Sequence, residues 1–277
     1  MTARFPPVPV AVVLAALAVL ALLVLLPLAV VFAEVLDQGI GRALAAFDDP
    51  ESQAAIRLSL LVAGISVPVN TLGGLAASWC IARFRFAGRG LLLTFVELPL
   101  SVSPVISGLV WVLLFGAQGW FAPALDRLGL QVIFATPGLV LATLFVTFPY
   151  VVRQLVPLML AQGSDEEEAA LTLGARPWAM FWHVTLPNVR WALLQGVLLL
   201  NARAMGEFGA VSVVSGRIRG QTLTMPLQIE ALYNDFQAPA AFSMAALLAL
   251  LALVTLAAKA ALEWHTRRAP DAAWVPA

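Results

Sequence analysis

The sequence predicts an all-α membrane protein with six transmembrane helices and a polar elbow between the fourth and the fifth. Hydrophobic residues make up 61% of the 277 residues, charged residues only 12%, and the mean hydropathy is +0.91. These values are too apolar for a soluble domain, so lipid must surround much of the chain. The apolar residues also gather in stretches that are each about long enough to cross a hydrocarbon core of roughly 30 Å. The predicted spans are residues 10–32, 58–82, 91–115, 137–158, 189–214 and 240–262.

The first span follows Arg4 and precedes an acidic segment, residues 34–57, which is predicted to be an external loop. A cleaved signal peptide is the alternative for this stretch, because small residues near its end suit a cleavage site. Its apolar core is longer than the roughly 7 to 15 residues typical of signal peptides, and this length favours a retained span.

The second span ends at a short loop that carries three arginines, Arg83, Arg85 and Arg89. Basic residues collect in cytoplasmic loops, so this loop is predicted to lie inside the cell. With six crossings, both termini then lie in the cytoplasm as well. The third span is broken by Pro99 and Pro104, and the fourth span leads the chain back to the cytoplasmic side.

The elbow, residues 164–187, begins with a run of acidic residues that cannot lie in lipid. Ser164 and Glu167 have the spacing of a capping box, in which the serine and the glutamate each bind a free N–H of the first helical turn. A helix is therefore predicted to begin here, and its first turn suits the negative charges. Gly174 can take the left-handed conformation that ends such a helix.

Two prolines in the elbow predict the helices that follow. Pro177 suits the first turn of a second short helix and Pro187 the first turn of a third, because proline needs no hydrogen-bond acceptor there. The elbow is therefore predicted to be a rigid helical unit displayed in water between two spans.

Several classes of function are excluded. The only lysine is Lys259, so the chain has no phosphate-binding loop that ends in Gly-Lys-Ser/Thr. His183 and His265 are far apart and lack cysteine or carboxylate neighbours, which argues against a metal site. The single cysteine, Cys80, excludes an internal disulfide, and a formal net charge of zero argues against a nucleic-acid partner. No enzyme site is recognisable.

The elbow resembles the EAA loop of permease subunits in bacterial ATP-binding-cassette importers. The matching residues are Glu168, Ala169, Ala170, Gly174, Leu186 and Pro187, with Val184 where the pattern usually has isoleucine. The resemblance implies a type I importer permease fold and a coupling helix that docks on a separate ATPase. ATP and Mg²⁺ are then bound by that ATPase, and this chain binds no cofactor or metal.

The resemblance continues in residues 97–120, 135–159 and 201–234, which are similar to the CysW-type permease subunits of bacterial sulfate and thiosulfate importers. It implies a bacterial inner-membrane protein that imports these oxyanions. The implied partners are a second, CysT-type permease, two copies of the ATPase and a periplasmic binding protein. The permease core is expected at residues 58–262, after an N-terminal span and loop (1–57) and before a cytoplasmic tail (263–277).

Two groups of residues are candidates for the pathway or its gate. In the fifth span, Arg203 and Glu207 are one helical turn apart and can pair, with Gly206 and Gly209 beside them. The alternative is an ion pair that fastens this span to the partner subunit. In the third span, hydroxyls near the proline break suit an oxyanion or bond to their own helix; this group comprises Ser101, Ser103, Pro104 and Ser107.

Other functions remain open from the sequence. A molybdate or tungstate importer is the nearest alternative, because those oxyanions have a similar shape and charge. A stand-alone secondary anion transporter would have no use for a coupling elbow, and the spans show no evident inverted repeat. A membrane scaffold without transport activity is the third alternative.

Overall fold

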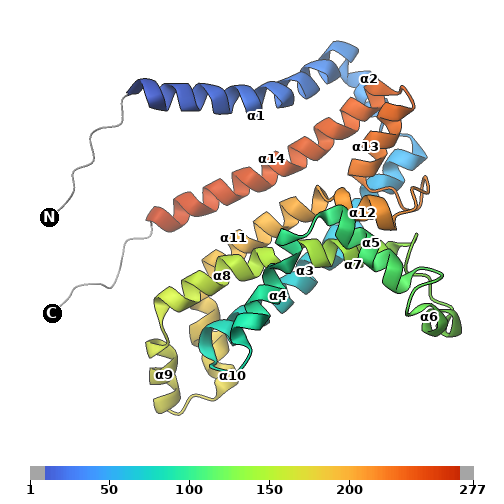
Figure 1. The fold of residues 1–277 in the computed structure, drawn as a ribbon. Coiled ribbons are helices and arrows are strands. Elements are labelled where there is room, and N and C mark those ends of the chain that lie inside the picture. The colour runs from blue at the N-terminus through green and yellow to red at the C-terminus, as the bar shows by residue number, and fades with distance from the viewer. Residues whose placement is uncertain (1–9, 269–277) are drawn as a thin grey trace.

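The computed structural model describes residues 10–268, and within this range every regular element is a helix. Figure 1 shows the helices in chain order. They are α1 (Val10–Gln38), α2 (Ile40–Ala45), α3 (Pro50–Arg83), α4 (Arg89–Ser101), α5 (Pro104–Phe115), α6 (Ala122–Leu128), α7 (Thr136–Thr147), α8 (Pro149–Gln162), α9 (Asp165–Thr172), α10 (Pro177–Met180), the π-helix η1 (Phe181–Thr185), α11 (Leu186–Met205), α12 (Gly209–Val214), α13 (Met225–Asn234) and α14 (Ala238–Arg268).

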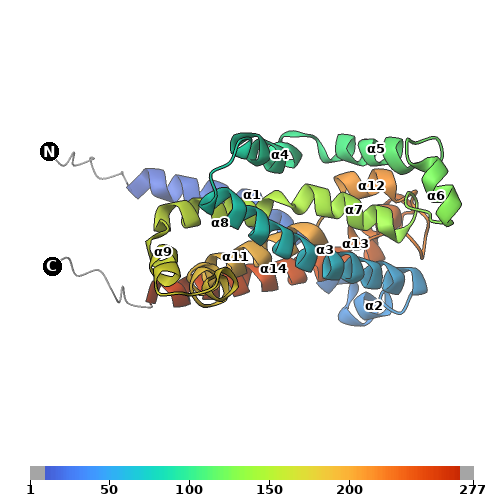
Figure 2. The ribbon, with the colours of Figure 1, turned by 90° about the horizontal axis from the view of Figure 1, so that it is seen from below.

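The helices run between two ends of an elongated molecule (Figures 1 and 2). One end holds α9, α10, the start of α1 and the finish of α14, and is called the elbow end below. The far end holds α2, α6 and α13. Helix α14 continues past the predicted span to Arg268, so the predicted tail starts as helix, and residues 269–277 lie outside the described residues.

Helix α3 is the longest element and forms the centre of the packing. It starts where the Asp49 carboxylate accepts a hydrogen bond of 2.9 Å from the Ser52 N–H, which satisfies a free donor of the first turn. Helices α7, α8 and α11 pack along it, and their buried side chains form two apolar clusters, one towards each end. Asn70 of α3 donates to the Leu144 carbonyl (2.9 Å) and to the Thr147 hydroxyl (2.8 Å), so its buried amide is satisfied.

The predicted count of six transmembrane helices is not confirmed by the length and apolarity of the described helices. Within the described residues, four helices are long and apolar enough to cross a membrane: Val12–Gln38, Pro50–Arg83, Thr136–Gln162 and Ala238–Trp264. A fifth is reached only if α4 and α5, which meet at an angle of 108°, form one broken span. The predicted break of the third span is present at Pro104, because the chain is extended at Val102 and α5 begins with this proline, whereas Pro99 lies inside α4 and does not break it.

The predicted fifth span, 189–214, is also not one helix. Helix α11 ends at Met205, and α12 begins only at Gly209. Arginines and amides along α11 lower its hydropathy. This explains why α11 is not among the four helices that are long and apolar enough to cross a membrane. Two of these side chains, Arg203 and Gln195, make polar contacts.

Helices α5 and α12 pack very closely, and glycines make this possible. A Cβ atom on Gly108 would lie 2.6 Å from the Ala210 carbonyl oxygen, and one on Gly209 would lie 2.8 Å from the Pro104 Cβ. Real Cβ atoms essentially never come this near to another heavy atom, so α5 and α12 can pack this closely only through glycine.

Gly108→Ala should therefore destabilise the protein although alanine is the better helix former. The gain of about 1 kcal/mol in helix propensity is outweighed by overpacking that costs roughly 1–3 kcal/mol. Gly64→Ala is the matched control, because Gly64 is helical and has nothing within 4 Å of its added Cβ. The Tm of the purified chain in mild detergent should fall for the first variant and stay or rise for the second. An equal Tm for both would contradict the close packing.

Candidate functional site

The elbow is a turn of two helices followed by one long helical rod. After α8, Gly163 (φ +71°) turns the chain into α9, and Gly174 (φ +86°) turns it again, as predicted for this glycine. Pro177 begins α10 and Pro187 lies in the first turn of α11, which confirms both proline positions. No break separates α10, η1 and α11, however, so the third predicted helix is the continuation of the second.

A π-turn connects these helices. The Leu186 N–H donates to the Phe181 carbonyl, five residues back, just before Pro187, whose ring would clash with a regular α-helical carbonyl. The rod that enters the membrane region therefore begins at Pro177 and reaches Met205, about 40 Å at the rise of an α-helix.

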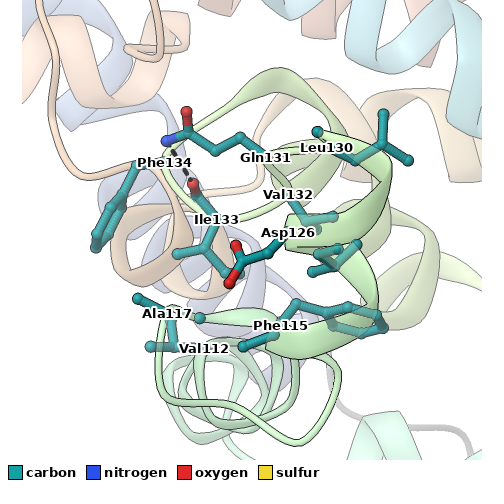
Figure 3. Close-up of a pocket in the computed structure, with 13 residues that line it drawn as sticks. Val112, Phe115, Ala117, Asp126, Leu130, Gln131, Val132, Ile133 and Phe134 are labelled. Carbon is teal, nitrogen blue, oxygen red and sulfur yellow. Dashed lines mark hydrogen bonds between the residues drawn. The ribbon is translucent and has the colours of Figure 1, made fainter.

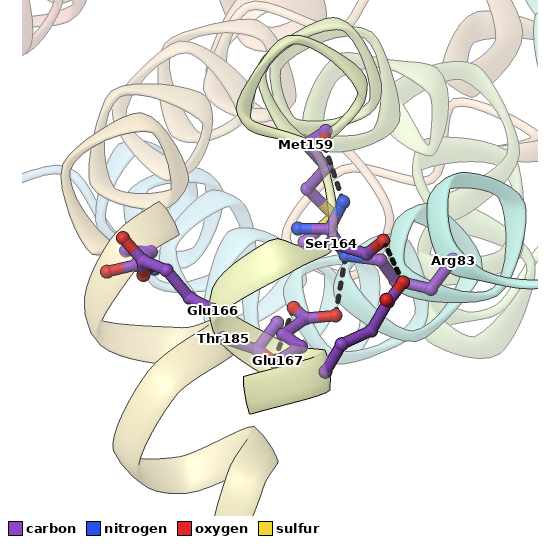
Figure 4. Close-up of polar contacts among 8 residues, drawn as sticks. Arg83, Met159, Ser164, Glu166, Glu167 and Thr185 are labelled. Atoms are coloured by element: carbon purple, nitrogen blue, oxygen red, sulfur yellow. Dashed lines mark hydrogen bonds and ion pairs between the residues drawn. The ribbon is translucent and has the colours of Figure 1, made fainter. Parts of the chain in front are cut away.

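Glu167 is the buried centre of the elbow (Figure 4). Its carboxylate forms an ion pair of 2.7 Å with the Arg83 Nε, and it accepts a hydrogen bond of 2.7 Å from the Thr185 hydroxyl. The side chains of Arg83 and Glu167 are only 11% and 8% exposed. The predicted capping box is thus wrong, because Glu167 turns inwards and the Ser164 hydroxyl donates to Glu168 instead, at 2.6 Å.

Arg83 extends this contact to two more helices. It is the last residue of α3, and its Nη1 donates to the Met159 carbonyl at 2.6 Å, near the end of α8. The last carbonyls of a helix have no partner within the helix, and a cation there also suits the helix dipole. Figure 4 shows the three connections converging from separate helices. The pair therefore ties α3, α8, α9 and η1 together at one point.

A second contact braces the same unit. The Asn188 amide of α11 donates to the Glu166 carboxylate, and the Asn188 carbonyl accepts from the Gln162 amide at 3.3 Å. The acidic run is therefore divided: Glu166 and Glu167 hold the elbow together, whereas Glu168 remains at the surface with Ala169.

Large apolar side chains are exposed on the elbow. Exposed fractions are 88% for Leu173 and 69% for Trp178, and Leu171 and Trp182 are also exposed. Exposed apolar groups of this kind are a feature of contact surfaces, and the small residues Ala169 and Ala170 lie beside them in the sequence. Leu186 differs, because it packs against the buried cluster around Val189 and so anchors the rod.

The predicted pair in the fifth span forms at the helix break. The Arg203 Nη1 lies 2.7 Å from the Glu207 Oε2, and the Glu207 Oε1 accepts a hydrogen bond of 3.0 Å from the Ala210 N–H. The Glu207 side chain is 1% exposed and that of Arg203 is 31% exposed. Glu207 thus neutralises the arginine and caps α12, a second task that the sequence did not indicate.

The third-span candidates are placed differently from one another. Ser107 is buried and donates to the Ser103 carbonyl at 3.2 Å, so it bonds its own helix. Ser101 and Ser103 are exposed at the corner between α4 and α5. Pro104 lies directly against Gly209, which brings the break in the third span against the break in the fifth.

A cavity of about 500 Å³ opens at the far end between α5, α6 and the segment before α7 (Figure 3). Its lining is mainly apolar, and its polar groups include the Asp126 carboxylate and Gln131, whose amide donates to the Ile133 carbonyl at 3.2 Å. An apolar wall with a carboxylate repels an anion, so this cavity does not suit an oxyanion.

Charges at the far end are paired as well. Arg217 lies 3.1 Å from Glu230, and Arg219 pairs with Asp235 and lies 3.8 Å from Glu51 of α3. The hydrogen bond to Asp235 raises the pKa of Arg219 above its ordinary value, so this arginine stays charged. Within residues 10–264, no three His, Cys, Asp or Glu side chains lie together as a metal site requires.

Long apolar helices joined by an internally braced polar elbow define the chain as a helical membrane protein. Its residues 69–269 match the family described as "Binding-protein-dependent transport system inner membrane component". The chain belongs to this family, and it is a transport permease subunit rather than an enzyme.

Two relatives share about half of their residues with this chain. It is 52% identical over 240 residues to the sulfate transport system permease protein CysW of Escherichia coli (strain K12), covering 87% of this chain and 82% of the relative. It is 50% identical over 241 residues to the CysW protein of Synechocystis sp., covering 87% of each. The predicted resemblance to CysW-type permeases is thereby confirmed. A CysT permease of Escherichia coli is 32% identical and covers 83% of each chain.

Solved structures support the fold. A bacterial ABC transporter involved in the import of the acidic polysaccharide alginate has a chain that matches with a TM-score of 0.72 at 17% identity, covering 94% of this chain and 95% of that one. The same kind of transporter in complex with an alginate pentasaccharide-bound periplasmic protein matches with a TM-score of 0.75, covering 95% of both chains. The fold is that of an ABC importer permease.

Glu167→Gln should loosen the elbow, because it leaves the buried Arg83 guanidinium without its counter-ion. Breaking a buried ion pair in this way costs roughly 3–5 kcal/mol. Hydrogen exchange of the amides in residues 165–175 should become faster by at least tenfold. Asp165→Asn is the control, since Asp165 is exposed in the same helical turn and should change exchange little.

A double-mutant cycle completes this test. Once Glu167 is replaced, Arg83→Met should cost little more, because the two side chains act on each other. Fully additive effects of the two replacements on exchange would show that the ion pair does not hold the elbow.

Proposed function

We propose that this chain is a transmembrane permease subunit of an ATP-driven importer for sulfate and thiosulfate. It forms half of the translocation pathway and couples to a separate ATPase through the elbow. The observation that carries the substrate class is the 52% identity to a sulfate transport system permease along 87% of the chain.

In this proposal the chain crosses the inner membrane six times, with the elbow and both termini in the cytoplasm. Helices α4 and α5 together make the third crossing, and α11 with α12 makes the fifth. The arrangement of the ends supports this topology, because the start of α1 and the finish of α14 lie at the elbow end (Figures 1 and 2). The arginines at positions 83, 85 and 89 follow the positive-inside rule on the same side.

Helix α9 and the turn at Gly174 dock on the ATPase in this proposal. Glu168, Ala169 and Ala170 form the contact with the exposed apolar side chains beside them, and ATP and Mg²⁺ belong to the ATPase alone. A displacement of α9 reaches α3 through the Arg83–Glu167 pair. It also reaches the Arg203–Glu207 break through the unbroken rod that starts at Pro177, with Leu186 and Pro187 at the base of α11.

The assembly contains a second, CysT-type permease, two copies of the ATPase and a periplasmic binding protein that delivers the anion. The 32% identity to a CysT permease supports a related partner subunit, because two such chains can form matching halves of one pathway.

The pathway and gate are assigned to the place where the two breaks meet. Irregular backbone at membrane depth is tolerated only where protein or a water-filled cavity covers it. The breaks after Ser101 and after Met205 satisfy this condition by lying against each other. The gate residues are then Ser101, Ser103, Pro104, Ser107, Arg203, Gly206, Glu207 and Gly209.

Uptake of labelled sulfate, thiosulfate and molybdate into vesicles that contain the full complex tests the proposal. Sulfate and thiosulfate should enter only when ATP and the binding protein are both supplied. Uptake of molybdate or tungstate alone would assign the chain to that importer class instead. Transport by this chain without an ATPase would assign it to the secondary transporters.

Gly174→Val should leave membrane insertion and complex yield normal but cut ATP-driven sulfate uptake by at least tenfold. A β-branched residue does not tolerate φ of +86°, so the turn between α9 and α10 must change. Gly39→Val is the matched control, because Gly39 has φ +87° and open space around it but lies at the far end. Normal uptake by the Gly174 variant would show that the coupling role is assigned to the wrong residues.

A further inference from the structure

The cavity at the far end, between α5, α6 and the segment before α7, has no part in the proposed transport path. Its volume of about 500 Å³ is in the range of small-molecule sites, roughly 300 to 1,000 Å³. Phe115, which lines it, is the last residue of α5, and Phe134, which also lines it, lies two residues before the apolar rod Thr136–Gln162. The cavity is therefore level with the ends of the spanning helices, at the membrane surface.

Hydrogen bonds from two neighbouring helices hold the walls of the cavity in place. The Phe121 N–H donates to the Leu114 carbonyl of α5 at 3.0 Å, and the Phe121 ring stacks on Phe115 with centroids 5.1 Å apart. The Phe134 N–H donates to the Val214 carbonyl of α12 at 2.9 Å, although φ of +61° is unfavourable for a bulky side chain. The cavity thus lies between fixed elements, as in sites that are formed before a ligand binds.

The wall contributed by α6 is apolar, and the way this helix ends makes it so. Gly129 has φ +62°, and the Leu130 N–H donates to the Leu125 carbonyl at 3.0 Å, which is the Schellman form of a helix end. This turn brings Leu130 back towards Leu125, and both side chains line the cavity. Apolar cavities stay dry and accept apolar guests. The lining therefore suits a hydrocarbon chain.

Asp126 places one negative charge in this apolar lining. Figure 3 shows its carboxylate among the side chains of Ala117 and Ile133. Among the residues that the structure describes, the carboxylate has no ion-pair or hydrogen-bond partner. A carboxylate binds a cation that carries N–H groups through charge-assisted hydrogen bonds. An apolar chamber with one carboxylate fits an amphiphile with an ammonium group.

The surface around the cavity indicates that this amphiphile comes from the bilayer. Trp120 is 85% exposed and Leu128 is 69% exposed, on either side of α6 in the sequence. Such side chains are unfavourable in water, and tryptophan is enriched where a membrane meets water. Leu130 and Phe134 are exposed and also line the cavity, so the lining is continuous with this apolar surface. A lipid can therefore enter from the surface that the membrane covers.

We propose that the far-end cavity binds a membrane phospholipid whose headgroup carries a primary ammonium. An acyl chain lies against Leu125 and Leu130, and the ammonium binds the Asp126 carboxylate. Phosphatidylethanolamine has this headgroup, whereas phosphatidylglycerol has no ammonium and the ammonium of phosphatidylcholine has no N–H. The inference goes beyond the proposed function, because it needs only that the chain lies in a membrane.

Lipid binding to the purified complete complex, measured by native mass spectrometry in mild detergent, tests the ammonium contact. Phosphatidylethanolamine should bind at least fivefold more tightly than phosphatidylglycerol or phosphatidylcholine with the same acyl chains. Asp126→Asn should abolish this preference. Arg127→Gln is the control, since Arg127 is the next residue of α6, is exposed and does not line the cavity. Equal binding of the three lipids, or a preference that survives Asp126→Asn, would overturn the proposal.

A second experiment locates the acyl chain. Phosphatidylethanolamine with a photoreactive diazirine in its chain should label residues 112–134 of the unsubstituted protein. Ala117→Phe should reduce this labelling at least fivefold, because the ring fills the cavity. Ala124→Phe is the matched control, since Ala124 is exposed on α6 outside the lining. Unchanged labelling of Ala117→Phe would refute the site, and so would labelling confined to other residues.

The occupant can also be distinguished from a protein partner. If Ala117→Phe abolished docking of the periplasmic binding protein while lipid labelling persisted, the cavity would belong to that protein and the proposal would fail. Neither experiment needs ATP or a transported anion. Loss of the lipid preference therefore leaves the proposed import function untouched, and failure of the unsubstituted complex to import sulfate would refute that function alone.

Discussion

The ion pair between Arg83 and Glu167 is the interaction on which the rest of the elbow depends. A short helix such as α9 has little stability alone, since helices of this length are marginal in water. Burial of the pair, with hydrogen bonds from the Thr185 hydroxyl and to the Met159 carbonyl, gives α9 a fixed position against three other elements. A surface ion pair could not do this, because water and salt would screen it.

The helical rod that leaves the elbow ends at an irregular junction. The rod from Pro177 to Met205 has no break, so in the proposed coupling a movement at the elbow would be transmitted along its length. It ends at Gly206, where a buried carboxylate replaces the regular helical hydrogen bonds by capping α12. Regular helix resists bending more than such a junction does, so in the proposed coupling the displacement would be absorbed at the junction. Gly108 and Gly209 let the α5 break lie against the same point.

Local pattern predicted the features that depend on neighbours in the chain. The turn at Gly174, the helix start at Pro177 and the pair of Arg203 with Glu207 follow from spacing alone, and the structure confirms them. Pro187 lies in the first turn of α11 as predicted, but α11 continues the preceding helix and does not start a separate one. The inward turn of Glu167 depends on Arg83, which is distant in the sequence. Arg83 was interpreted only as a marker of membrane orientation, although its position at the end of a span on the elbow side was the available clue.

The break in the fifth span could not be predicted from the sequence, for a related reason. Proline and glycine mark where a helix can stop, but Pro68, Pro99 and Pro157 lie inside helices that continue. What decides is whether the freed backbone groups find other partners. Glu207 supplies one for Ala210, and that contact needs the chain to have turned already. Tertiary contacts therefore decide at which proline or glycine a helix ends.

The balance of charge between Arg203 and Glu207 connects these observations to anion transport. A carboxylate in an anion pathway repels the substrate unless a cation compensates it, and Glu207 is compensated by Arg203 and buried to 2% exposure. The break thus obtains its cap without adding net negative charge to the path.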